Sequence, residues 1–181
     1  MAVCAAMFSA CADDESFSTS RSDVLAFSVD SVRLDTTFSN VPTPTASCWV
    51  YNRSGKGIRC SSVRLENGNQ TGFRVNVDGS YLGETVGYQT QDVEVRKGDS
   101  IRVFVELTSH VQHADVPKLV EDNLVFTLES GVQQKLNLNA YSWDALLLRD
   151  KRVSQDEVIQ SSQPIVVYGG IRVDSLATLT I

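Results

Sequence analysis

The sequence predicts an all-β protein. Period-2 alternation of apolar and polar residues recurs along most of the 181-residue chain, as in half-buried strands. No long stretch has apolar residues at the i, i+3, i+4, i+7 spacing of an amphipathic helix. Turn signals such as Asn67-Gly68 and Asp78-Gly79 separate the alternating runs. With 42% hydrophobic and 21% charged residues, the chain has the composition of a folded domain.

The ordered part is expected to begin near Val24, with a first strand or bent pair at residues 25–34. A β-hairpin is predicted over Thr45–Leu65, where two strand-like runs flank the Gly-bearing turn Arg53–Gly57. Later strand signals cover Phe73–Val77, a second hairpin of Gln91–Val95 with Ile101–Leu107, and a third hairpin of Leu124–Leu128 with Leu136–Ala140.

The return arm of the first hairpin breaks the alternation. Ile58 and Cys60 share one parity, whereas Val63 and Leu65 share the other. A regular strand would send these two pairs to opposite faces, so one extra residue is needed to bury both. The sequence therefore predicts a β-bulge at Ser61-Ser62.

Cys48 and Cys60 are the only cysteines in the predicted folded part, on opposite arms of the expected hairpin. A disulfide requires the two to face each other, which only one of several strand registers allows. The alternative, which we prefer on this evidence, is that both are small buried apolar side chains.

Charge argues against nucleic acid as a partner. The chain carries 16 basic and 22 acidic residues, for a net charge of −6. Its basic clusters are no longer than the dipeptides Arg96-Lys97 and Lys151-Arg152. Binding to a phosphate backbone needs a denser basic surface than this.

No motif predicts catalysis, a metal or a cofactor. His110, His113 and Asp115 lie in one irregular segment, but their spacing lacks a fourth ligand or a helical frame, so a solvent-facing loop is expected. Serine nucleophile elbows, Gly-rich phosphate loops and Cys-pair metal signatures are absent from the sequence. We therefore expect a protein that is not an enzyme.

The first residues resemble the end of a bacterial lipoprotein signal. The run Ser9-Ala10-Cys11 fits the pattern of small residues before a cysteine that is lipidated after cleavage, although Phe8 replaces the usual leucine. The acidic run Asp13–Glu15 is similar to an export tag for the outer face of the outer membrane. The resemblance implies a signal remnant, lipidated Cys11 and Ser/Thr-rich tether over residues 1–23, and a surface-exposed outer-membrane location.

Two alternatives stay open at this terminus. The first apolar run could be a core strand or helical turn that happens to contain cysteine. A secretory signal also needs positive residues ahead of its apolar run, and these are missing, which a start upstream of Met1 would explain.

Framework residues carry a second resemblance, seen in Val50-Tyr51-Asn52, Val63-Arg64-Leu65, Phe73 to Gly79 and Gly98 to Glu106. They resemble the N-terminal immunoglobulin-like domain of large surface lipoproteins that continue into a right-handed parallel β-helix. The resemblance implies an immunoglobulin-like β-sandwich of about seven or eight strands over residues 24–143. It also implies a connector at 144–163 and a first β-helix coil at 164–181, as in a fragment of a longer protein.

These observations favour a surface-anchored, non-catalytic spacer or interaction module, with the membrane as partner through the N-terminal lipid. The alternative is an accessory domain, with glycan binding as one role, of a β-helix carbohydrate-active enzyme. An extracellular glycan or protein is the further partner class. Trp49 and Tyr51 form the candidate ligand face. The alternative, which we prefer on this evidence, is that they pack under a neighbouring strand or the loop Thr108–Asp122.

Overall fold

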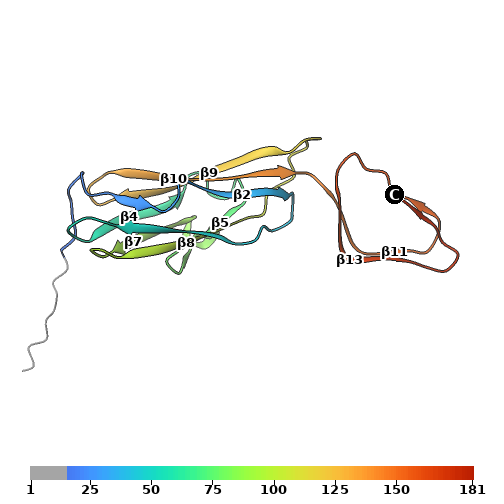
Figure 1. Cartoon of the computed structure of the whole chain (residues 1–181), viewed down its shortest axis with the longest axis horizontal. Coiled ribbons are helices and arrows are strands. Elements are labelled where there is room, and N and C mark those ends of the chain that lie inside the picture. The colour runs from blue at the N-terminus through green and yellow to red at the C-terminus, as the bar shows by residue number, and fades with distance from the viewer. Residues whose placement is uncertain (1–15) are drawn as a thin grey trace, which may run out of the picture.

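The computed structural model describes residues 16–181, and strands dominate it (Figure 1). The described part contains no α-helix, and its one helical element is the single 3-10 turn η1 (Glu84–Val86). This confirms the all-β class. Among the described residues, no helix is long and apolar enough to cross a membrane.

Two five-stranded sheets face each other and form a β-sandwich. The first sheet has the order β1 (Leu25–Phe27), β3 (Ala46–Asn52), β8 (Ser100–Leu107), β5 (Phe73–Val77) and β6 (Ser80–Tyr81). The second has the order β2 (Ser31–Phe38), β10 (Gln133–Trp143), β9 (Lys118–Leu128), β4 (Ile58–Leu65) and β7 (Gln89–Val95). Neighbouring strands are antiparallel except β2 and β10, which pair in parallel.

Alternation along the strands fills the space between the sheets. In β8, the inward residues Val103, Val105 and Leu107 are fully buried, while the intervening side chains face outward. Phe126 of β9 packs against Phe27 of β1 with ring centroids 5.3 Å apart, so one aromatic contact links the two sheets. Burial of apolar surface from both inner faces stabilises the sandwich.

The structure corrects two of the three predicted hairpins. β3 and β4 belong to different sheets, as do β7 and β8, so neither pair is a hairpin. Buried Asn52 holds the corner between β3 and β4: its Nδ2 donates to the carbonyls of Lys56 and Val95, each at 2.8 Å, and its Oδ1 accepts from the Ser54 amide. Alternation identifies a strand but not its partner, which explains the error. The third hairpin, β9 with β10, is confirmed.

The predicted bulge is present. Cys60 pairs with Leu128 of β9, but Ser62 pairs with Thr127, so Ser61 is the extra residue. Cys60 and Val63 are both fully buried as a result. On the other side of β4, the neighbouring strand β7 compensates at Asp92, which has a positive φ of 53°.

Residues 16–23, where the sequence suggests a tether, contact the sandwich. Phe17 forms a parallel bridge with Gly57, and the Ser18 amide donates to the Gly57 carbonyl at 2.8 Å. The Arg59 guanidinium lies 4.2 Å from the centre of the Phe17 ring. A Cβ on Gly57 would come within 2.9 Å of that ring, so the close approach depends on glycine. One aromatic residue thus joins a Ser/Thr-rich segment to the fold.

The chain after the sandwich makes two parallel strand pairs. β11 (Leu146–Val153) pairs with β13 (Ile165–Val173), and β12 (Glu157–Val158) pairs with β14 (Leu179–Thr180). The expected connector at 144–163 therefore contains strands. Charged residues interrupt the apolar alternation there, so the sequence pattern does not reveal these strands. Figure 1 shows this coil beyond one end of the sandwich, away from the end where the described chain begins.

Candidate functional site

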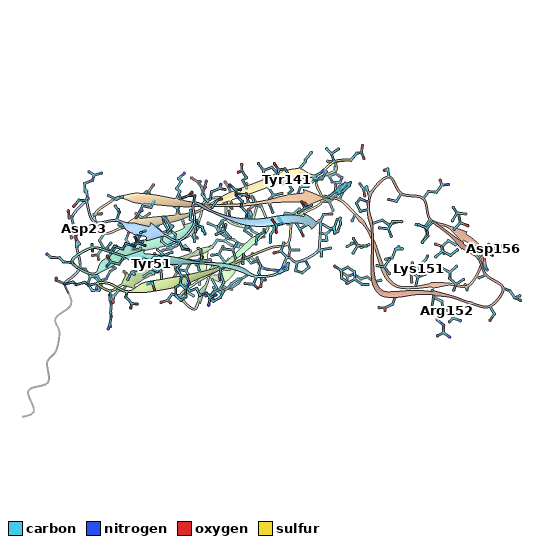
Figure 2. The ribbon with its side chains drawn as sticks, in the orientation of Figure 1. Asp23, Tyr51, Tyr141, Lys151, Arg152 and Asp156 are labelled. Atoms are coloured by element: carbon cyan, nitrogen blue, oxygen red, sulfur yellow. The ribbon has the colours of Figure 1, made fainter. Side chains whose placement is uncertain are left out.

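The outer face of the first sheet carries the candidate ligand residues. Trp49 and Tyr51 of β3 alternate with buried Cys48 and Val50, so both rings point away from the core. Trp49 is 41% exposed and Tyr51 is half-buried. Figure 2 labels Tyr51 on the sheet opposite Tyr141. The face is thus open to solvent at Trp49.

An arginine occupies the space between two exposed rings of this face. Arg102 of β8 pairs with Trp49 across the strands, and its guanidinium carbon lies 5.2 Å from the Trp49 ring centre and 5.0 Å from that of Phe104. Its Nη2 donates to the Ser47 hydroxyl at 2.9 Å. These cation–π contacts hold a positive charge at the surface in a defined position.

A carboxylate lies further along the same face. Glu106 of β8 forms an ion pair with Arg74 of β5, with Nη2 and Oε2 3.0 Å apart, and accepts a hydrogen bond from the Thr45 hydroxyl. The Thr45 hydrogen bond and the Arg74 charge lower the pKa of Glu106 against the opposing effect of desolvation. Glu106 is therefore ionised at neutral pH and acts as a fixed acceptor, the opposite of a general acid.

A small hollow of about 130 Å³ opens between the rings of Phe104 and Tyr81. Asn76 pairs with Phe104 on one side and with Tyr81 on the other, so it lies between the two rings. Arg74 and Glu106 line the same hollow. The hollow combines aromatic surfaces with hydrogen-bonding groups, the mixture found in small-molecule binding sites.

Cys48 and Cys60 are free thiols in different sheets, so no disulfide joins them. Burial raises the pKa of Cys48 to about 11 and that of Cys60 to about 12. Both therefore stay protonated and apolar at neutral pH, in agreement with the preferred interpretation from the sequence.

The remaining candidate residues do not assemble into a site. His110, His113 and Asp115 are all exposed, in the segment between β8 and β9. Within residues 16–181, no three His, Cys, Asp or Glu side chains are placed to hold a metal ion. Cys11 lies outside the described residues.

Sequence reasoning selected Trp49 and Tyr51 as candidates but not Arg102, Phe104 or Tyr81, which the structure places on the same face. Parity within β8 was sufficient to place Arg102 and Phe104 on one face. It could not show that this face adjoins Trp49, because β3 and β8 are far apart in sequence.

The chain matches no known family profile. It is 33% identical over 115 residues to the Der GTPase-activating protein YihI of Yersinia pseudotuberculosis. The match covers 62% of this chain and 58% of that protein, so the chain spans little more than half of its length.

Several solved structures share part of the arrangement at low identity. A Porphyromonas gingivalis W83 protein of unknown function is 10% identical with a TM-score of 0.43, covering 73% of this chain and 60% of that one. The Escherichia coli chaperone DraB is 13% identical with a TM-score of 0.40, covering 66% and 56%. The PapD-like domain 7 of human CEP192 is 9% identical with a TM-score of 0.38, covering 66% and 85%. These values carry no functional argument, and the sandwich is established by the strand pairing of the chain itself.

Proposed function

We propose that this chain is a non-catalytic module of a bacterial cell surface. A lipid on Cys11 anchors it to the outer membrane, and the immunoglobulin-like sandwich acts as a spacer and interaction domain. Residues 144–181 begin a right-handed parallel β-helix that the sandwich holds away from the membrane.

The repeat in the C-terminal strands carries this proposal. Paired residues are 19 positions apart at Leu146 and Ile165, and 20 apart at Val153 and Val173. They are 22 apart at Glu157 and Leu179. Parallel pairing at nearly constant offset means that the chain completes a circuit and returns beside itself, the arrangement of successive coils in a β-helix.

Burial within the two turns supports stacking of this kind. Val153 of the first turn is fully buried and Ile159 is 8% exposed, whereas Val173 in the second turn is 43% exposed. In a β-helix, each turn covers the interior of the one before it. A further turn would cover Val173 as the second turn covers Val153.

The position of the coil also supports a spacer role. The sandwich separates Asp23 from the coil, and Figure 2 shows Lys151, Arg152 and Asp156 at the end of the molecule away from Asp23. An anchor at the N-terminal end would therefore hold the coil outward by the length of the sandwich.

Lipidation is tested by intact-mass measurement of the chain made in a host that processes lipoproteins. We expect loss of residues 1–10 and a mass gain equal to acylation at the new N-terminus. Cys11→Ser should abolish both, while the matched variant Cys4→Ser should leave them unchanged. An unmodified Cys11 would overturn the anchor.

Surface display is tested on intact cells by protease digestion. The lipidated chain should be cleaved without lysis. Replacing Asp13, Asp14 and Glu15 with Asn, Asn and Gln should protect it while leaving the lipid in place. Equal protection of both forms would contradict an outward-facing location.

A second candidate function is an accessory domain that brings a carbohydrate-active β-helix to its substrate. The observation that favours it is the exposed aromatic face around Trp49 and Phe104, because aromatic rings are suited to stacking on sugars. Loss of polysaccharide binding on removal of these rings would support this function.

A further inference from the structure

We infer that the outer face of β3, β8, β5 and β6 binds an acidic polysaccharide, with one sugar unit in the hollow between Phe104 and Tyr81. The inference deepens the interaction role proposed above by naming the partner class and its site. The centre of the proposed ligand face is then the hollow over β8, β5 and β6, and no longer Trp49 and Tyr51 of β3.

The two outer faces of the sandwich differ in chemistry. Exposed rings lie across the first sheet from β3 to the edge strand β6, where Trp49 is 41%, Phe104 37% and Tyr81 55% exposed. The second sheet presents polar residues such as Asn137 and Asn139 there, and its exposed ring, Tyr141, lies near the coil (Figure 2). A cluster of exposed aromatic surface on one face marks an interaction site.

Strand register sets the spacing of the rings. Phe104 and Tyr81 flank Asn76 on adjacent strands, so their backbones lie two strand spacings apart, about 10 Å. Trp49 continues the row on β3 on the other side of Phe104, because Ser47, two residues away, pairs with Phe104. The three rings form an oblique row that suits an extended chain of sugars.

The hollow offers groups that recognise a sugar ring. At about 130 Å³ it has roughly the size of one such ring, and the Phe104 and Tyr81 side chains line it for contact with the apolar C–H faces. Asn76 Oδ1 accepts from the Gly79 amide at 2.9 Å, which leaves its NH₂ group to donate. Arg74 and the Tyr81 hydroxyl provide further donors beside the rings.

Charge selects an acidic polysaccharide over a neutral one. The whole chain has a net charge of −6, yet the outward positions of these strands carry Arg74 and Arg102 against the single carboxylate Glu106. Glu106 already pairs with Arg74. Among the described residues, the side chain of Arg102 contacts two rings and a hydroxyl, and no carboxylate forms an ion pair with it. A sugar carboxylate would supply that partner.

The test is binding of the full chain to immobilised polygalacturonate, alginate and hyaluronan. Fully methyl-esterified polygalacturonate is the matched neutral probe, because it keeps the sugar backbone and removes the charge. We expect binding to at least one acidic polymer, weakened about tenfold or more by esterification. Binding to none of the three acidic polymers would overturn the inference. Equal binding of polygalacturonate and its methyl ester would overturn the acidic class.

Variants locate the site. Phe104→Ala and Arg102→Ala should each weaken binding about tenfold, whereas Tyr141→Ala on the other sheet should leave it unchanged. Tyr81→Ala, at the more exposed wall of the hollow, provides a second ring variant if Phe104→Ala lowers the unfolding temperature. Unchanged binding by folded Tyr81→Ala and Arg102→Ala would place the ligand elsewhere and overturn the site. The mass of lipidated Cys11 is independent of this readout, so failure here and failure of the anchor are distinguishable.

Discussion

The carboxylate of Asp144 accepts a hydrogen bond from the backbone amide of Gln112 at 2.8 Å. It also accepts one from Ala114 at 3.1 Å, and Asp144 is only 3% exposed. Asp144 immediately follows β10 and lies two residues before β11. One carboxylate therefore fixes the segment between β8 and β9 at the point where the chain leaves the sandwich for the coil.

Removing the charge of Asp144 should destabilise the point where the chain leaves the sandwich for the coil. Asp144→Asn replaces an ionised acceptor of backbone amides with a neutral amide, and we expect the free energy of unfolding to fall by about 2 kcal/mol. Asp115→Asn, an exposed change in the same segment, is the control and should alter it by less than about 0.5 kcal/mol. Urea unfolding measures both, and equal effects would contradict the role of Asp144.

The same residue predicts a pH dependence. Burial by itself raises the pKa of Asp144, but hydrogen bonds from the amides of Gln112, Ala114 and His113 and from Ser39 outweigh it and lower the pKa below its ordinary value. The stabilisation is therefore present above the unfolded-state pKa of about 4 and is lost as pH falls through the folded-state pKa. The stability difference between wild type and Asp144→Asn should be constant above about pH 5 and shrink below about pH 4. Unfolding at stepped pH checks this, and a difference unchanged at pH 2 would be the contrary result.

The paired irregularity in β4 and β7 predicts compensation between two deletions. Deleting Ser61 alone makes β4 regular against β9 but leaves Asp92 unmatched in β7, so we expect a loss of about 2 kcal/mol or more. Deleting both Ser61 and Asp92 restores regular alternation in β4 and β7 and should recover most of the lost stability. Thermal unfolding compares the two forms. A double deletion as unstable as the sum of the single deletions would show that the irregularities are independent.

Buried Cys48 and Cys60 should resist thiol reagents. Their raised pKa values, about 11 and about 12, leave almost no thiolate near neutral pH, and the core excludes the reagent. Iodoacetamide should modify neither residue in the native protein and both in urea. Peptide mass mapping reads each site separately, and labelling of either in the native state would contradict the closed core.

Gly169 predicts a change confined to the coil. It has a φ of 73°, and a Cβ there would meet the carboxylate of Asp150, whose exposed side chain can turn aside. Gly169→Ala should therefore cost roughly the 1–2 kcal/mol expected from a left-handed backbone. Gly131→Ala, with φ 78° and open space around it, isolates that backbone cost. Hydrogen exchange should show loss of protection in β11 and β13 only, and a loss spread into the sandwich would contradict a separable coil.

The alternation of apolar residues by itself determined the all-β class, the inward faces of the strands and the extra residue at Ser61-Ser62. These are local properties, because the side-chain period of a strand and a break in its parity can be read from neighbouring residues. The hairpin of β9 and β10 was also accessible, since its short turn leaves the two strands adjacent.

Tertiary structure decided which strands became neighbours. β3 pairs with β8, and Ser47 and Arg102, which share a hydrogen bond across these strands, are 55 residues apart in the sequence. This pairing places Arg102 between Trp49 and Phe104. It also decided that Phe17 packs against Gly57 and that β11 lies beside β13. Pairing between distant strands depends on how the whole core closes, and alternation carries no information about it, because a strand of given parity can pair with any other. The sequence thus determined which side chains face outward, and only the fold assembled them into a surface.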